Sequence, residues 1–217
     1  MAGRGSKTRA TQDESPAEQI ERLRRENAAL RRELSDMRGL ALRDQLTGLY
    51  SRRYLTDYLQ HEIAADDEGP TISLALCDID DFKTINDRHG HRAGDIAIVC
   101  IADILDDLAD GQPVIRWGGE ELLIVLFGTD EPEALRLCES MRHQVERYRM
   151  NDGRTEFSCT LTFGVGAYDR RLTFAENFAC IDRALYRGKD GGKNRSVVAL
   201  GTPGVVALGT PGGEAMA

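Results

Sequence analysis

The stretch that decides the fold runs from Pro113 to Phe127 and reads PVIRWGGEELLIVLF. Two apolar segments, 113–117 and 121–127, have the composition of β-strands, and the glycine pair between them predicts a tight hairpin turn. Glu120 and Glu121 come directly after the glycines, where the second strand begins. Glycine lets a bulky ligand approach the backbone, and adjacent carboxylates at a turn can hold a divalent metal. Taken alone, the segment fits a solvated acidic hairpin equally well.

A second acidic cluster lies upstream and favours the metal interpretation. It reads CDIDDFK, residues 77–83, and follows an apolar run, 71–76, with the composition of a buried strand. Acids at the end of a buried strand are costly unless something pairs with them, and Mg²⁺ is the usual partner where phosphates are handled. Lys83 adds a cation at the same place. A calcium loop is excluded, because the sixth position is Lys83 rather than Gly and the twelfth is His89 rather than Glu.

Two glycine-rich segments do not complete a nucleotide-binding motif. The segment GKDGGK, residues 188–193, has the wrong spacing for a P-loop, and no hydroxyl residue follows it. The segment GVG, residues 164–166, lacks the third glycine of a dinucleotide fingerprint.

Length, charge and cysteines limit the class of protein. A chain of 217 residues permits one domain plus extensions. Its net charge of −8 argues against a nucleic-acid surface, but not against a nucleotide, which needs only a local pocket of metal and Lys. No apolar run of about 18 residues occurs, so we expect no membrane span and a cytoplasmic location. The cysteines lack metal-ligand spacing and predict buried free thiols at Cys77, Cys100, Cys138, Cys159 and Cys180.

Residues 15–43 have the pattern of a coiled coil. Ser15 and Pro16 form a helix start, and the apolar positions from Ile20 to Ala41 then alternate spacings of three and four. Asn27 takes one of these positions, where Asn fixes register and a two-stranded state. We expect a parallel dimeric coiled coil rather than a single helix packed on the domain, because the apolar seam is narrow.

The rest of the chain alternates helices and strands. Besides the hairpin we expect helices at 51–65, 91–110, 131–149 and 174–187, and strands at 71–79, 157–167 and 195–200. This order predicts an α/β sandwich in which helices cover a mixed sheet. At the C-terminus the segment VVALGTPG occurs twice in succession, at 197–204 and 205–212, and its Gly and Pro content predicts a flexible end.

Five motifs together resemble the GGDEF domain of diguanylate cyclases. They cover roughly residues 43–198: RDQLTGL (43–49) with RRYL (52–55), DIDDFK (78–83) with ND (86–87), GH (90–91) with GD (94–95), RWGGEEL (116–122), and DRALY (182–186) followed by Lys189, Gly192, Asn194 and Arg195. The signature reads GGEEL here, and Glu at its third position is a common active variant in that family. Leu122 replaces the usual Phe at a position that we expect to be buried, where it should affect packing more than chemistry.

The resemblance implies a fold and a reaction. The fold is a palm-like β-α-β-β-α-β core shared with nucleotidyl cyclases, preceded here by the long coiled-coil helix. The domains would be a disordered basic tail at 1–14, the stalk at 15–43, the catalytic domain at 44–198 and a flexible tail at 199–217. The implied enzyme is a nucleotidyltransferase of bacterial signalling and biofilm formation, which condenses two GTP into cyclic di-GMP and pyrophosphate. One domain holds one GTP, so a homodimer tethered through the stalk is expected.

The resemblance also implies metal-binding and catalytic residues. Mg²⁺ or Mn²⁺ is expected at Asp78, the carbonyl of Ile79, Glu120 and Glu121. Glu120 is the candidate acceptor of the hydroxyl proton, and Glu121 either completes the metal shell or has a structural role in the hairpin. Lys83 is expected to stabilise phosphate charge in the transition state.

Residues that contact the substrate follow in the same way. Backbone N–H groups of Asp81, Phe82 and Lys83 would cradle phosphates. Lys189 and Lys193 would bind phosphate oxygens, although Lys193 stands where the family usually has Arg and so lacks the bidentate fork. The matches to the family's guanine readers are Asn86 and Asp95.

Two other functions stay open, and two further expectations concern control. The chain could be a non-catalytic module that binds GTP or cyclic di-GMP, or a coiled-coil adaptor whose domain is only a cap. The Arg-x-x-Asp product site of many family members is replaced at Ala109 and Gln112, which predicts weak or absent feedback by cyclic di-GMP. Because no sensor domain is visible, a partner protein that clamps the stalk is the expected input.

Overall fold

The computed structural model describes residues 42–60, 63 and 69–200. The predicted basic tail, nearly all of the predicted stalk and the second copy of the C-terminal repeat lie outside these residues. So does the end of the helix that was expected at 51–65. In the part of the chain that is described, no helix is both long and apolar enough to cross a lipid bilayer.

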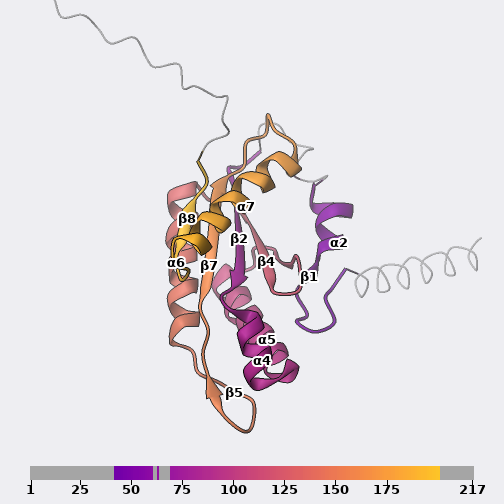
Figure 1. The fold of residues 1–217 in the computed structure, drawn as a ribbon. Helices are drawn as coiled ribbons and strands as arrows, with labels where there is room; N and C mark the ends of the chain where they lie inside the picture. Colours follow the sequence, from indigo (N-terminus) through magenta and orange to yellow (C-terminus); the bar gives the residue numbers. More distant parts are fainter. Residues whose placement is uncertain (1–41, 61–62, 64–68, 201–217) are drawn as a thin grey trace, which may run out of the picture. The chain divides into compact units, whose positions relative to one another are not determined.

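A six-stranded mixed sheet forms the centre of the domain (Figure 1). Its order is β1 (Tyr50–Ser51), β3 (Val114–Arg116), β4 (Glu121–Phe127), β2 (Ile72–Ile79), β7 (Leu161–Ala167) and β8 (Ser196–Val198). The outer pairs β1–β3 and β7–β8 are parallel, and the inner pairs are antiparallel. The predicted mixed sheet and hairpin are therefore confirmed.

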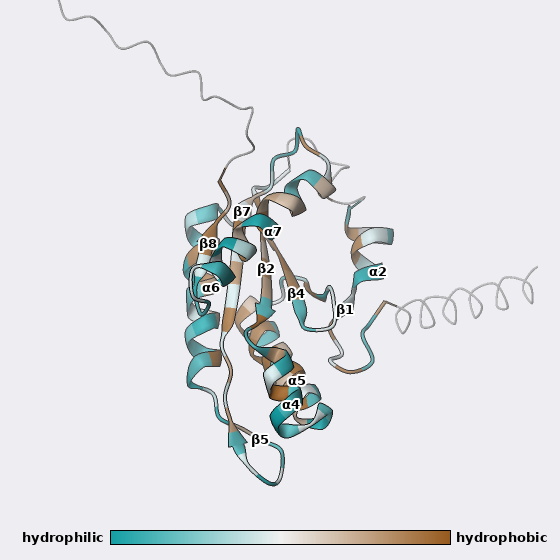
Figure 2. Cartoon of the chain, viewed as in Figure 1, coloured by the Kyte–Doolittle hydropathy of each residue, from teal (hydrophilic) through white to brown (hydrophobic). Residues whose placement is uncertain are grey.

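Helices cover both faces of this sheet and create two apolar cores. On one face lie α4 (Phe82–His89), α5 (His91–Ala109) and α6 (Glu131–Arg147), and on the other α2 (Arg52–Tyr54), the π-helical turn η1 (Leu55–Leu59) and α7 (Phe174–Asp190). In Figure 2 the strands are largely hydrophobic, whereas the visible surface of α6 is largely hydrophilic. The order β2, α4–α5, β3, β4, α6, β7 is the expected β-α-β-β-α-β core.

Alternation along β2 decides which side its acidic end faces. Ala75, Cys77 and Ile79 belong to the core under α5 and α6, whereas Leu74 and Leu76 belong to the core under α7. Because neighbouring side chains in a strand point to opposite faces, Asp78 lies on the α7 side.

Three expectations about local structure need correction. The strand expected at 157–167 is divided into β6 (Glu156–Phe157), which pairs with β5 (Met150–Asn151) in a separate small sheet, and β7. Helix α4 was not predicted, because it is short and Asp81 caps it in a left-handed conformation (φ 55°) without a side-chain hydrogen bond. All five cysteines are free, but Cys100 and Cys180 are only partly buried.

The expectation for Leu122 is confirmed, because its side chain is buried, with 1% exposed.

Candidate active site

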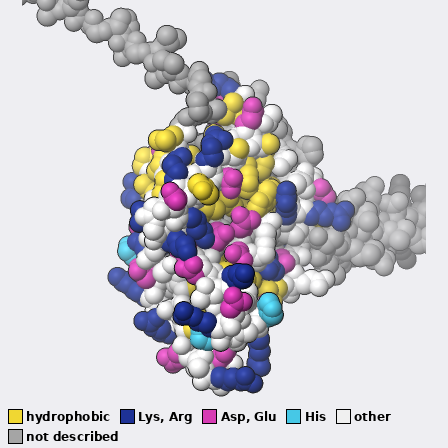
Figure 3. All heavy atoms as spheres, viewed as in Figure 1, with side chains coloured by type: hydrophobic (Ala, Val, Ile, Leu, Met, Phe, Trp, Pro, Cys, Tyr) yellow, Lys and Arg dark blue, Asp and Glu magenta, His cyan; other side chains and the backbone are white. Residues whose placement is uncertain are grey.

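The two acidic segments meet at one end of the sheet. The register of β2 and β4 places Asp78 opposite Glu121, and the Ile79 N–H donates to the carbonyl of Glu120 over 3.3 Å. Asp78 therefore lies in β2 and Glu120 directly before the neighbouring strand β4, so the two acids come from adjacent strands of the sheet, close to the prediction. In Figure 3 Asp and Glu side chains gather near the middle of the visible face, with Lys and Arg side chains around them.

The glycine pair shapes the turn that carries the two glutamates. The N–H groups of Trp117 and Gly118 both donate to the carbonyl of Glu121, over 2.9 and 3.2 Å. A Cβ at Gly118 would lie 2.6 Å from Glu121 Oε2, so the missing side chain leaves room for that carboxylate. Gly118 is therefore needed at this position, because a side chain there would collide with the carboxylate of Glu121.

Arg116 ties this turn to the start of the domain. Its Nη2 donates to the carbonyl of Gly119 over 2.8 Å, and its Nη1 to Asp44 Oδ1 over 2.9 Å. Burial raises the pKa of Asp44, but hydrogen bonds from Arg116 and Thr47 outweigh it and hold that pKa below its usual value. Asp44 lies in the matched segment RDQLTGL, yet no role was predicted for it, since the contact joins residues far apart in sequence.

Burial first, and then the charge of neighbouring acids, raises the pKa of the clustered carboxyl groups. For Asp78 burial is the main cause and the charge of Asp80 adds to it, against the opposing effect of Lys189. Burial and the charge of Asp78 likewise raise the pKa of Glu120 and of Glu121. Such a group of partly buried carboxylates is stabilised by a cation.

Lys189 supplies a cation at this point. It reaches from the end of α7, and its ammonium donates to Asp78 Oδ1 and, over 3.4 Å, to the carbonyl of Ile79. It also lies 3.3 Å from Asp80 Oδ1. The prediction for Lys189 was a phosphate contact, so its contact with two expected metal ligands was not foreseen.

The oxygen atoms of Asp78 and Ile79 at this strand end fit a divalent ion. Among residues 42–60, 63 and 69–200, no group of three His, Cys, Asp or Glu side chains is assembled as a complete metal site. However, the ammonium of Lys189 stands in for a cation on the Asp78 carboxylate and the Ile79 carbonyl. Carboxylate and carbonyl oxygens are the ligands that Mg²⁺ and Mn²⁺ prefer.

Asp80 and Asp81 have different roles from Asp78. Asp80 is buried and accepts hydrogen bonds from the hydroxyls of Thr160 and Thr162, each over 2.7 Å. Asp81 is exposed and accepts from Lys193 over 2.5 Å. The predicted substrate residues Asp81 and Lys193 are thus brought together.

Asn86 and Asp95 come from adjacent helices at the predicted guanine position. Asn86 lies on α4, and its Oδ1 is buried without a hydrogen-bond partner. A Cβ added to Gly94, which precedes Asp95 on α5, would lie 2.1 Å from that oxygen. A buried acceptor without a partner is costly, so this atom points to a ligand donor.

The remaining predicted residues lie at the start of α4. Phe82 is buried in the core, so only its backbone is available to a ligand. Lys83 is exposed, and within the described residues its side chain has no partner. A cleft of about 610 Å³ adjoins the acidic cluster: Asp80 and Asp81 line it, with Thr84, Arg88 and His89 among others, but Asp78, Glu120 and Lys189 do not. Acids and lysines at a strand end, rather than a deep cavity, define the candidate site.

Comparison with known proteins identifies the family. The family profile described as "Diguanylate cyclase, GGDEF domain" matches residues 41–195. The chain belongs to the GGDEF family. It is 33% identical over 184 residues to the diguanylate cyclase DgcP of Pseudomonas aeruginosa, a match that spans 84% of this chain and 27% of DgcP. The chain spans less than half the length of the curated relatives that it matches here.

Solved GGDEF structures share the fold. The coiled coil and GGDEF domain of DgcB from Caulobacter crescentus, in complex with c-di-GMP, superposes with a TM-score of 0.75 at 28% identity and covers 83% of this chain and 97% of that one. SiaD of Pseudomonas aeruginosa, in complex with its activator SiaC, gives 0.72 at 31% identity and covers 84% and 72%.

Proposed function

We propose that this GGDEF protein is a diguanylate cyclase, which joins two GTP molecules into cyclic di-GMP and releases two pyrophosphates. The observation that carries the proposal is the meeting of Asp78 with Glu120 and Glu121 beside Lys189. A buried acceptor without a partner, Oδ1 of Asn86 on α4, adds to it. The first group suits a metal-bound triphosphate, and the second suits a base with N–H donors.

A divalent ion, Mg²⁺ or Mn²⁺, would be held by Asp78, the carbonyl of Ile79, Glu120 and Glu121. When bound, it supplies positive charge that neutralises phosphate oxygens and acidifies a nearby hydroxyl. This assignment leaves the carboxylate of Asp78 shared between the ion and Lys189.

The chain's own residues bind and orient the nucleotide. Asn86 and Asp95 accept hydrogen bonds from the ring N–H and the amine of guanine, which adenine does not present in the same way. Lys189 and Lys193 carry charge to the phosphates, and Lys83 adds a third cation from the first turn of α4. Backbone N–H groups from Asp81 to Lys83 complete the phosphate contacts.

Glu120 accepts the proton of the ribose 3′-hydroxyl as that oxygen attacks the α-phosphate of the other GTP. Burial and the charge of Asp78 raise the pKa of Glu120, and a bound divalent ion would oppose that effect, so its position beside the ion is the reason for assigning it this role. The new bond joins the 3′-oxygen to phosphorus, and pyrophosphate leaves with the electron pair of the broken bond. Two such steps close the ring.

Each domain supplies one nucleotide, so two copies must face each other. A parallel coiled coil over 15–43 would tether them at high effective concentration. The relative DgcB was solved with a coiled coil, and SiaD with an activator, which supports a stalk that a partner protein controls. The replacement of Arg-x-x-Asp at Ala109 and Gln112 predicts that cyclic di-GMP inhibits the initial rate weakly or not at all.

The test uses the purified full chain with GTP and Mg²⁺, and measures cyclic di-GMP and pyrophosphate. Glu120→Gln should abolish product, whereas Asp106→Asn, an exposed acid on α5, should not. Binding of GTP without turnover at any protein concentration would support a non-catalytic module instead.

A second readout tests the metal without activity. Mg²⁺ or Mn²⁺ should raise the melting temperature of the wild type, since binding to the folded state stabilises it, and Asp78→Asn should remove the effect. Equal stabilisation of both proteins would place the ion elsewhere.

A further inference from the structure

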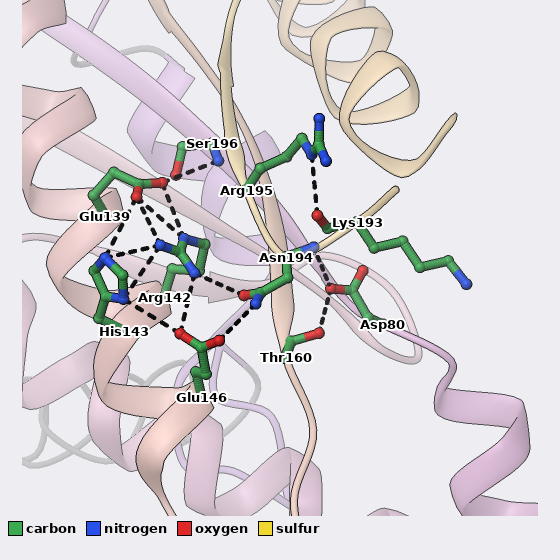
Figure 4. A network of polar contacts seen from close by, with 10 residues as sticks. All are labelled: Asp80, Glu139, Arg142, His143, Glu146, Thr160, Lys193, Asn194, Arg195 and Ser196. Atoms are coloured by element: carbon green, nitrogen blue, oxygen red, sulfur yellow. Dashed lines mark hydrogen bonds and ion pairs between the residues drawn. The ribbon is translucent and has the colours of Figure 1, made fainter. Parts of the chain in front are cut away.

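A partly buried polar network joins α6 to the loop between α7 and β8, beside the candidate site (Figure 4). At its centre is Asn194, which is drawn between the side chains of α6 and Asp80. The inference drawn from it rests on the proposed function.

The loop has a backbone that needs support. Gly192, Lys193 and Asn194 have φ angles of 111°, 62° and 47°. Glycine adopts such angles freely and Asn tolerates them, but Lys rarely does. Three consecutive left-handed residues persist only where surrounding contacts hold them.

Asn194 makes those contacts on both sides of the loop. Its Oδ1 accepts from Arg142 Nη1 over 2.8 Å, and its Nδ2 donates to Glu146 Oε1 over 2.8 Å. Its backbone N–H donates to Asp80 Oδ2 over 2.9 Å. The residue is therefore fixed to α6 and to the end of β2 at the same time.

Arg142 is itself held rigidly. Its side chain is 9% exposed, and its Nε and Nη2 donate to Glu139 while Nη1 reaches Glu146. Glu139 also accepts from the Ser196 N–H over 3.1 Å. The planar guanidinium and its two carboxylates give a fixed surface on which the loop is seated.

The loop carries one cation of the site, Lys193, and follows directly on the end of α7, which carries the other, Lys189. Lys193 directly precedes Asn194, and its N–H donates to the carbonyl of Gly188, next to Lys189. The Lys193 ammonium reaches Asp81, and Lys189 reaches Asp78. Because Lys193 is a flexible and partly exposed side chain, its position depends on the backbone that Asn194 fixes.

We infer that Asn194 and Arg142 are positioning residues, which set where Lys193 and Lys189 present their charges to the triphosphate. Neither residue is among the substrate contacts proposed above. They act on phosphate binding, and not on guanine recognition, because Asn86 and Asp95 lie on other elements.

The test compares two probes that cannot react: 3′-deoxy-GTP, which lacks the attacking hydroxyl, and 3′-deoxyguanosine, which lacks phosphates. The full chain is titrated with each in the presence of Mg²⁺. In Asn194→Ala and Arg142→Met we expect the Kd of 3′-deoxy-GTP to rise about tenfold, the usual cost of removing a supporting contact. The Kd of 3′-deoxyguanosine should stay at the wild-type value.

Two further variants make the test specific. Arg136→Met removes an exposed arginine from the same helix and should leave both Kd values unchanged. Asn194→Gly permits the left-handed backbone and keeps the backbone bond to Asp80, but it removes both side-chain anchors to α6, so its affinity for 3′-deoxy-GTP should stay low. The Asn194 variants also keep the test valid if Arg142→Met, which takes the arginine away from Glu139 and Glu146, fails to fold.

The outcomes separate the inference from the proposed function. If Asn194→Gly binds 3′-deoxy-GTP as tightly as the wild type does, the side chain of Asn194 is not an anchor. If a variant loses affinity equally for both probes, the residue has only a structural role. If the wild type binds no 3′-deoxy-GTP, the proposed function falls and the inference with it. If the wild type binds and every variant binds as tightly, the inference alone is wrong.

Discussion

Gly94 gives the sharpest single test of the guanine position, because there stability and binding should change differently. An added Cβ would lie 2.1 Å from Asn86 Oδ1 and 3.0 Å from Phe82 Cζ. An ordinary contact is about 3.5 Å, so the Asn86 amide must retreat by about 1 Å or more. The colliding atom is the end of a flexible side chain, which can move at small cost.

The stability change should therefore be small. Gly→Ala inside a helix is worth about 1 kcal/mol in favour of Ala, and this offsets the cost of moving Asn86. For a chain of this size we expect the melting temperature of Gly94→Ala to stay within about 4 °C of the wild type.

Binding should change much more. Displacing Asn86 removes one or two hydrogen bonds to guanine, worth about 1–3 kcal/mol, or roughly 5- to 150-fold in the Kd of 3′-deoxy-GTP. The preference for guanine over adenine nucleotides should fall with it, since the base contact is the one that is lost.

A double-mutant cycle decides whether the effect passes through Asn86. In Asn86→Ala the colliding oxygen is gone, so adding Gly94→Ala should cost nothing further. Additive losses, or full guanine selectivity in Gly94→Ala, would refute the placement of the base at Asn86.

Three other variants test the rest of the structure. Asp44→Asn should lower the free energy of unfolding by about 1–3 kcal/mol at pH 7, because it removes the ion pair with Arg116. The pKa of Asp44 is held below its usual 3.8, so this stabilisation is present above pH 3.8 and is lost as the pH falls below that value. Denaturant titrations in which the wild type stays more stable than Asp44→Asn at lower pH would contradict the pairing. Gly164→Ala should lower the free energy of unfolding by about 3 kcal/mol and the melting temperature by about 6–12 °C, because its Cβ would lie 2.0 Å from the backbone oxygen of Ile181. A fall in melting temperature of less than about 2 °C would show that α7 can shift. Leu122→Phe introduces the residue that is usual in the family, but it should lower the free energy of unfolding by about 1–3 kcal/mol, because Leu122 is buried and closely packed. A higher melting temperature in calorimetry would reveal unfilled space around this side chain.

The amino-acid sequence was sufficient for the hairpin, for the strand that carries Asp78 and for the long helix α5. These features follow from local patterns: glycines at a turn, apolar runs and a helical period, each of which acts within a few residues. Helix α4 escaped prediction because it is only eight residues long and begins at Asp81 without a capping side chain.

Tertiary structure decided the contacts of the candidate site. Nothing local shows that Lys189 meets Asp78, that Arg116 pairs with Asp44, or that Asn194 rests on Arg142. Each contact joins distant residues, and it exists because the strand register and the packing of α6 and α7 place two side chains within reach. The sequence therefore identifies the chemical groups of the site, whereas the packing of the sheet and its helices determines which of them contact one another.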